Sequence, residues 1–290
     1  MTQPIEAVPI TLCADDFGIA PGVDDGIVAL AESGRLTAVS CMTVLPRWPA
    51  AAQRLVALAS RVDIGLHFTL TGLSPLGVMP KFAPDGQLPS LGPLLVAAMA
   101  RCLAQDEIAA EFARQLDAFG AALGRLPDFV DGHQHVHQFP GVRNILTTAL
   151  ADHGNTVWLR NTATTPSRLL RRRTALPRAA FLAAVGFGAR DCWRAAGFAT
   201  NADFAGVRDF NETAPYSVLM RRFLADAQPD LLIMCHPGRV DAELSGRDPV
   251  TAPRAEELAY LGGPQFADDL AAAGCRLVRP GARQTSSACG

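Results

Sequence analysis

The sequence predicts a single α/β domain, in which parallel strands alternate with helices to form a closed or incomplete barrel of seven or eight strands. Short apolar runs alternate with helical segments along the chain, an order typical of a parallel sheet. Acidic residues and histidines recur at the ends of the predicted strands, where barrels of this class gather their catalytic groups. No linker is long or polar enough to mark a boundary, so we expect one domain over 1–280 and a flexible tail over 281–290.

The first half of the chain supplies four strands and the helices between them. Short apolar runs predict strands at 10–13, 38–44, 63–68 and 129–131. Amphipathic or alanine-rich segments predict helices at 23–33, 49–60 and 106–123. A loop rich in glycine and proline at 71–93 follows the third strand, and we expect it to be mobile over the barrel mouth.

The second half continues the same alternation. Apolar runs predict strands at 157–160, within 197–204, at 231–235 and at 276–278. Helices are expected at 142–153, 216–227 and 254–273, and in shorter pieces over 167–188. Each strand is therefore followed by helical structure, as a barrel of strand–helix units requires.

The charge balance gives no reason to expect a polyanionic partner. The net charge is −2 and the sequence pI is about 6.3, so neither nucleic acid nor an anionic membrane surface is expected as a main partner. The basic run over 168–178 is the exception. We interpret it as a solvated surface segment, with a lip that binds an anionic substrate group as the alternative.

The cysteines and the apolar segments indicate the cytoplasm. Seven cysteines are scattered without a C-x-x-C pair, and Cys13, Cys41 and Cys235 lie in strand-like runs as small core residues. This usage fits a reducing compartment. The first residues lack the pattern of a signal peptide, and no apolar stretch approaches the about 20 residues of a membrane span, so no stable membrane insertion is expected.

Two adjacent carboxylates, Asp15 and Asp16, follow the first predicted strand. Burying two like charges together is costly unless a cation or a shared proton relieves the repulsion. The alternative is that one of them caps the next helix, because a carboxylate there accepts hydrogen bonds from free amides. Histidines at other strand ends favour a functional site over a helix cap.

Those histidines complete a candidate metal site. His67 ends the third strand, and His133 comes two residues after Asp131 at the end of the fourth. Asp16, His67 and His133 would hold one divalent metal and leave positions open for water and substrate. His135 and His137 follow at a spacing of two, and either a supporting or a substrate-facing role is open to them.

Two further residues would carry the proton transfers. Asp15 lies beside the metal ligands and could take a proton from water, while His236 ends the most apolar strand and could protonate a leaving amine. This set favours hydrolysis of an amide. The alternative of a glycoside hydrolase that uses Asp15 and Asp131 without metal fits less well, since two carboxylates across the sugar are the norm there.

Five motifs in this order resemble those of one enzyme family. They are Ala14-Asp15-Asp16-Phe17-Gly18, Gly34-x-Leu36-Thr37-x-x-Ser40, Gly65-Leu66-His67-Phe68, Asp131-Gly132-His133-Gln134-His135-Val136-His137 and Cys235-His236-Pro237-Gly238. The set resembles the YdjC-like family of carbohydrate deacetylases, which includes chitooligosaccharide deacetylases and hopanoid-associated members. The family's barrel is related to that of the NodB-type polysaccharide deacetylases.

The resemblance implies removal of an N-acetyl group from an amino sugar of an oligosaccharide or glycolipid. It implies Asp16, His67 and His133 as metal ligands and Asp15 as the base. It implies His236 as the acid less directly. Zn²⁺ suits the Asp/His/His set, whereas Mg²⁺ prefers oxygen ligands, and both are considered. An inactive sugar-binding member is a further alternative, and assembly into a homo-oligomer is left open. No family motif falls in 162–209, which we expect to shape substrate choice.

Overall fold

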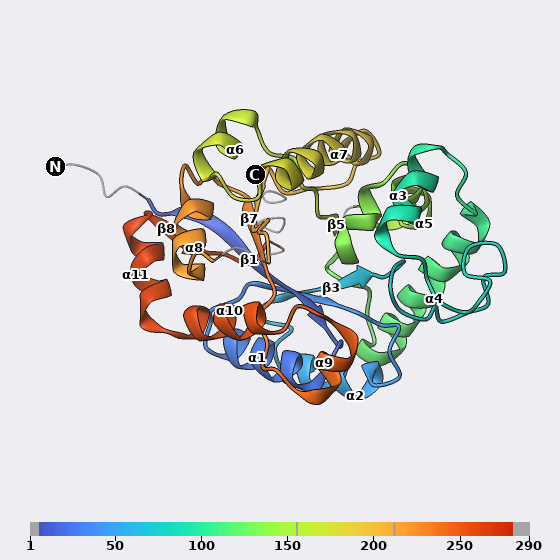
Figure 1. Ribbon diagram of the computed structural model, residues 1–290, viewed down its shortest axis with the longest axis horizontal. Coiled ribbons are helices and arrows are strands. Elements are labelled where there is room, and N and C mark those ends of the chain that lie inside the picture. The colour runs from blue at the N-terminus through green and yellow to red at the C-terminus, as the bar shows by residue number, and fades with distance from the viewer. Residues whose placement is uncertain (1–5, 155, 211–212, 281–290) are drawn as a thin grey trace.

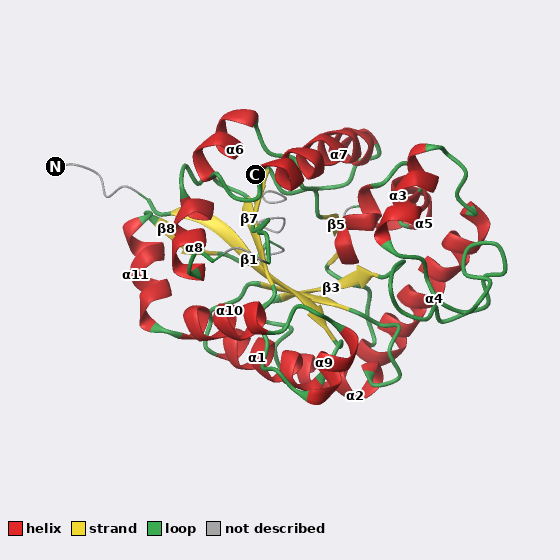
Figure 2. Ribbon diagram, viewed as in Figure 1, coloured by secondary structure: helices red, strands yellow, loops and turns green. Residues whose placement is uncertain are grey.

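The computed structural model describes residues 6–154, 156–210 and 213–280, so the predicted tail over 281–290 lies outside the described residues. Within the described part, strands and helices alternate, and helices surround a central sheet (Figures 1 and 2). The strands are β1 (Val8–Phe17), β2 (Ala38–Cys41), β3 (Asp63–Phe68), β4 (Phe129–Gly132), β5 (Trp158–Leu159), β6 (Asp203–Ala205), β7 (Leu231–Cys235) and β8 (Cys275–Leu277).

The sheet is parallel and curls into an incomplete barrel. Its order is β5-β4-β3-β2-β1-β7-β6, with β8 paired to the first residues of β1. The edge strands do not form a continuous ladder with each other. Leu159 nevertheless pairs with Thr200 in a single parallel bridge, and the backbone N–H of Asn161 donates to Asn201 Oδ1 at 2.8 Å. These contacts draw the two edges together, and the predicted fold class is confirmed.

Helices and short turns connect the strands. They are α1 (Pro21–Glu32), α2 (Trp48–Val56), α3 (Leu91–Met99), α4 (Gln105–Leu123), α5 (Val142–Ala149), α6 (Pro166–Arg172), α7 (Leu176–Ala195), α8 (Tyr216–Leu224), α9 (Ala242–Arg247), α10 (Ala252–Gly262) and α11 (Pro264–Ala272). Two 3₁₀ segments, His133–Gln138 and Ala151–His153, complete the elements. None of the helices in the described ranges is long and apolar enough to cross a membrane.

Several predicted boundaries were wrong, and local chemistry explains them. The single helix expected over 254–273 is two helices, because Pro264 follows the extended Gly263 and begins α11 as a new helix. The helix expected over 142–153 ends at Ala149 and continues as a 3₁₀ turn. Two short helices, α3 and α9, were not predicted.

The loop over 71–93, whose mobility over the mouth stays a prediction, is hydrogen-bonded to α4. The carboxylate of Glu111 accepts hydrogen bonds from the backbone N–H groups of Leu76 at 2.9 Å and Gly77 at 3.2 Å. Glu107 accepts two more from Lys81 and Phe82. Glu111 is fully buried, so these bonds form a fixed anchor along the flank of the barrel.

The core is continuous from the sheet to the helices around it, and Cys13, Cys41 and Cys235 lie in it as predicted. One close approach requires a glycine. The ring of Phe129 stacks on Trp158 with centroids 4.3 Å apart and covers Gly65, where an added Cβ would lie 2.4 Å from that ring. Gly65 thus lets β3 and β4 pair in the register that aligns His67 with Asp131.

Candidate metal and catalytic site

A break in the pairing of β1 brings both carboxylates of the Asp15-Asp16 pair to one site. Neighbouring residues of a regular strand point to opposite faces. The register between β1 and β2 shifts between Ala14 and Phe17, and Asp16 has a positive φ of 67°. A bulge of this kind re-aims side chains, and here Asp15 and Asp16 both line the same cavity.

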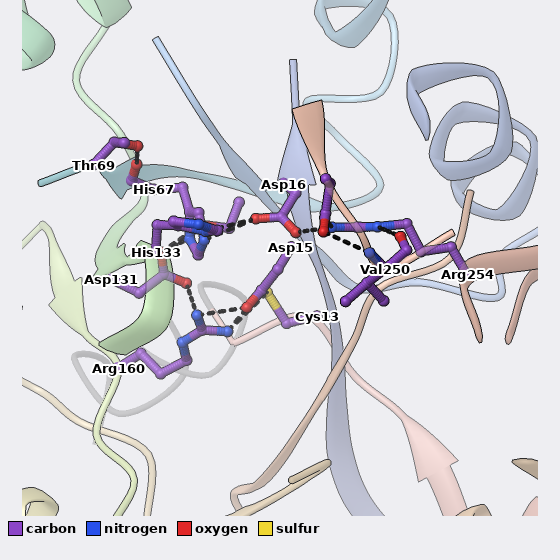
Figure 3. Close-up of polar contacts among 12 residues, drawn as sticks. Cys13, Asp15, Asp16, His67, Thr69, Asp131, His133, Arg160, Val250 and Arg254 are labelled. Atoms are coloured by element: carbon purple, nitrogen blue, oxygen red, sulfur yellow. Dashed lines mark hydrogen bonds and ion pairs between the residues drawn. The ribbon is translucent and has the colours of Figure 1, made fainter. Parts of the chain in front are cut away.

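Asp16, His67 and His133 converge as the sequence predicted. Oδ1 of Asp16 lies 3.2 Å from Nε2 of His67 and 3.1 Å from Nδ1 of His133 (Figure 3). Metal–ligand bonds of about 2.0–2.1 Å place tetrahedral ligand atoms roughly 3.3 Å apart, so the three atoms fit one ion. Within the described chain, this group and a second one, formed by Cys13, Asp15 and Asp131, have the composition of a metal site.

A carboxylate behind His67 holds its ring for ligation. Nδ1 of His67 lies 2.7 Å from Oδ1 of Asp131, and the Ser40 hydroxyl donates to the same oxygen at 2.5 Å. Asp131 therefore keeps a proton on Nδ1, so that Nε2 is the nitrogen that binds a metal once its own proton is displaced. Burial opposes a charged imidazole, but Asp131 and the two carboxylates of β1 outweigh it and raise the pKa of His67 to about 10.

Arg254 of α10 holds the other oxygen of Asp16. Its Nη2 lies 2.5 Å from Oδ2 of Asp16 and 2.6 Å from Oδ2 of Asp248. Burial disfavours the carboxylate, yet Arg254 and the two histidines hold the pKa of Asp16 well below its usual range. Asp16 therefore stays ionised and presents a single oxygen, Oδ1, to His67 and His133.

Arg160, directly after β5, joins Asp15 to Asp131. Its guanidinium contacts both oxygens of Asp15, at 2.7 and 2.8 Å, and Oδ2 of Asp131 at 2.7 Å (Figure 3). All three side chains are buried. The guanidinium already pairs with both carboxylates, so the oxygens in the group of Cys13, Asp15 and Asp131 are engaged without a metal. The Arg160 guanidinium also fixes the orientation of Asp15 beside Asp16.

His236 lies at the end of β7, and its side chain lines the same cavity. Its backbone N–H donates to Oε2 of the buried Glu257 at 2.6 Å, and the ring of Phe210 meets its imidazole edge-on. Burial lowers the pKa of His236, and the carboxylates of Asp16 and Glu257 offset only part of that effect. A histidine with a lowered pKa gives up its proton readily once it is charged.

His133, His135 and His137 point in different directions, because the segment after β4 is a 3₁₀ turn and not a strand. His133 joins the metal group. His137 Nε2 lies 2.8 Å from the backbone carbonyl of Arg160, and its ring stacks on Trp193. Burial lowers the pKa of His137 to about 3, so it supports the fold as a neutral ring. His135 lines the cavity.

The site opens into a cavity of about 360 Å³. Its walls include Asp15, Asp16, His67, His133, His135, His236 and four arginines, Arg178, Arg208, Arg247 and Arg254. A larger cavity of about 770 Å³ between α3 and the start of α4 contains none of these residues. The chemistry thus gathers in the smaller cavity, with only residues 71–73 of the 71–93 loop in its wall.

Sequence reasoning missed two arginines of this site. Arg160 ends a predicted strand, so the strand-end rule that selected His67 could have selected it too. Arg254 opens a helix far along the chain, and no local pattern marks it. Of the basic run over 168–178, Arg172 is buried against Asp203 at 2.5 Å, while Arg178 reaches the cavity wall. The run is therefore not a uniformly solvated segment.

The fold and this group define an α/β-barrel protein with a candidate metal centre at the carboxyl ends of its strands. The YdjC-like protein family model matches residues 9–272, and the chain belongs to that family. It is 30% identical to a carbohydrate deacetylase of Geobacillus stearothermophilus, over 91% of this chain and 94% of that protein. It is 28% identical to a chitooligosaccharide deacetylase of Klebsiella pneumoniae, with the same two coverages.

Solved structures show the same fold. A crystal structure from Enterococcus faecalis V583, provisionally described as a cellobiose-phosphate cleavage protein, matches with a TM-score of 0.71. It is 19% identical, and the match covers 94% of this chain and 98% of that one. The Xyl-CE4 domain of a xylanase from the hindgut metagenome of Trinervitermes trinervoides matches with a TM-score of 0.50 at 11% identity, over 98% and 92% of the chains. These likenesses show that the chain shares its fold with both structures.

Proposed function

We propose that this protein is a metal-dependent carbohydrate deacetylase, which hydrolyses the N-acetyl group of an amino sugar to acetate and a free amine. The convergence of Asp16, His67 and His133 beside the Asp15 carboxylate carries the proposal. Membership of the YdjC-like family and the activities of its curated relatives support it. The substrate is an N-acetylated oligosaccharide or glycolipid.

The donor set favours Zn²⁺ over Mg²⁺. Two imidazole nitrogens and one carboxylate oxygen are a common zinc set, whereas Mg²⁺ takes oxygen ligands almost throughout. What the ion supplies when bound is polarisation of the amide carbonyl and a lower pKa for water. Asp16, His67 and His133 are the residues proposed to hold it.

The remaining residues carry the protons. Asp15, oriented by Arg160, removes a proton from the attacking water as its oxygen bonds to the acetyl carbon. His236, in the same cavity, gives a proton to the sugar nitrogen as the C–N bond breaks. Acetate and the free amino sugar result. No oxidant or second substrate is needed.

The alternative of a glycoside hydrolase requires a second catalytic carboxylate, and Asp131 is not available for that role. Asp131 would have to face a sugar across from Asp15, but it is fully buried and bonded to His67, Ser40 and Arg160. Burial would raise its pKa, yet Arg160 and His67 outweigh it and lower the pKa of Asp131 to about 2. Such a group cannot serve as the general acid that glycosidic cleavage needs.

The proposed activity predicts acetate release that depends on a metal. Purified protein incubated with N-acetylglucosamine oligomers or N-acetylated glycolipids should release acetate, and dialysis against a chelator should abolish the release. Zn²⁺ should restore it more completely than Mg²⁺. Elemental analysis should find about one ion per chain. Cleavage of glycosidic bonds without acetate release would contradict the proposal.

His236→Ala should lower kcat on an N-acetyl sugar by about 10²–10⁴-fold and leave metal content intact, because the amine leaves poorly without a proton. The loss should be much smaller on 4-nitrophenyl acetate, whose phenolate leaves unprotonated. Steady-state kinetics on the two substrates measure the difference. An equal loss on both would assign His236 to substrate binding or to the fold instead.

The compartment and the assembly remain predictions. The six cysteines of the described chain are free, and four of them are buried, which supports the proposal of a reducing cytoplasm. A homo-oligomer also remains a prediction.

A further inference from the structure

The turn after β4 holds two consecutive residues in the left-handed region. Gln134 has a φ of 54° and His135 a φ of 61°, and neither is glycine. Residues other than glycine rarely adopt this conformation, and such strained residues cluster at functional sites. The consequence is that His135 turns away from both His133 and His137 and into the cavity wall.

The imidazole of His135 is buried in the cavity wall. The residue is 5% exposed, and its Nδ1 is enclosed without a hydrogen-bond partner among the described residues. Nδ1 is completely enclosed, so Nε2 is the nitrogen that remains for the cavity. The ring of Phe204 meets the imidazole edge-on, with centroids 5.6 Å apart. Because the residue lines the cavity and Nδ1 is enclosed, Nε2 is the polar atom of His135 that a ligand in the cavity could meet.

His137 provides the contrast within the same motif. It is also buried, but Nε2 is paired with the Arg160 carbonyl and the ring stacks on Trp193 at an interplanar angle of 11°. His137 is absent from the cavity wall, which His135 joins together with Arg178 of α7. Nδ1 is enclosed and unpaired in both histidines, so what distinguishes them is Nε2, which is bonded to a carbonyl in His137 and belongs to a cavity-lining residue in His135.

The chemistry of an imidazole decides which group of a ligand His135 would suit. A neutral imidazole offers one donor and one acceptor. An alcohol hydroxyl matches it in either tautomer, because a hydroxyl both donates and accepts. A carboxylate or phosphate would match only the tautomer that carries the proton on Nε2.

We propose that His135 is a specificity-determining residue, which hydrogen-bonds a ring hydroxyl of the sugar through Nε2. The inference rests on the proposed function and deepens it, since it assigns recognition of the sugar ring to a residue outside the metal and proton-transfer groups. The strained turn holds the imidazole in place before the sugar arrives, so little entropy is lost on binding.

His135→Asn tests the proposal without disturbing the turn. Asparagine tolerates a positive φ, so the backbone can keep its conformation, but its side chain is too short to reach the same hydroxyl. We expect kcat/KM for the N-acetylglucosamine dimer to fall about 10- to 100-fold, as for a lost contact that leaves a buried partner unpaired. Activity on 4-nitrophenyl acetate and metal content should stay close to those of the parent protein, while the melting temperature should fall moderately, because the ring loses its contact with Phe204.

Two matched variants complete the kinetic test. His153→Asn makes the same change in a partly exposed 3₁₀ turn outside the cavity, and its kinetics should be unchanged. His137→Asn should also lower the melting temperature, because it removes a buried ring from its stack. Unchanged kcat/KM for the dimer in His135→Asn, an equal loss on both substrates, or a loss of metal would each overturn the proposal.

A binding measurement separates this inference from the proposed function. Calorimetric titration of the metal-loaded protein with the N-acetylglucosamine dimer should give a dissociation constant that His135→Asn raises about tenfold or more. If the parent protein binds the dimer but releases no acetate, the proposed function fails while the role of His135 is still decided by this titration. Equal affinities in the parent and the variant would overturn the role of His135 even in an active enzyme.

Discussion

His67→Ala should remove tightly bound metal and with it essentially all deacetylation. Nε2 of His67 is one of three atoms that converge on the ion position, and Asp131 holds the ring in the tautomer that ligation needs. Losing one of three protein ligands commonly destroys affinity. Elemental analysis after exhaustive dialysis measures the effect directly, and circular dichroism checks that the variant is folded.

Metal binding to the parent protein should weaken as the pH falls. The carboxylates around His67 raise its pKa to about 10 without metal, and a metal must displace the proton from Nε2. Below that pH, each unit should therefore lower the apparent affinity by up to tenfold. Titration with Zn²⁺ at several pH values tests this. A His67→Ala protein that retains a full equivalent of metal would refute the ligand assignment.

Asp15→Asn should cut turnover by roughly 10²–10⁴-fold while the metal stays bound, because an amide cannot accept the proton from water. Asp15 is not part of the group of Asp16, His67 and His133. Its carboxylate is held in place by Nη1 and Nη2 of Arg160. Single-turnover kinetics on an N-acetyl sugar, with metal content measured on the same sample, separate the two effects.

A second variant tests whether the loss of turnover in Asp15→Asn comes only from disturbance of the buried network. Asp15→Asn leaves Arg160 with one charged partner, Asp131, so the melting temperature should fall moderately. Ser40→Ala removes a hydrogen bond to Asp131 from the same buried network and leaves Asp15 in place, so it reports what disturbance alone costs. Near-parental turnover in Asp15→Asn, or loss of its metal, would reject Asp15 as the base.

The fold class and the three candidate ligands could be predicted from the sequence alone. The alternation of apolar runs and helices predicts a parallel barrel, and such a barrel brings its strand ends together. Asp16, His67 and His133 all lie at strand ends, so their convergence in the structure followed from the periodicity of the chain. The motif resemblance added the family, which the match over 9–272 confirmed.

The pairing of the charges, in contrast, could be seen only in the folded chain. The bulge in β1 brings Asp15 and Asp16 to one side, although a regular strand would separate them. Arg160 and Arg254 reach these carboxylates across 145 and 238 residues of sequence, and no local pattern encodes a contact of that range. Likewise, a spacing of two cannot show that His135 faces the cavity while His137 is enclosed. The positive φ angles of Gln134 and His135 separate the two side chains, and these angles depend on the packing around the turn.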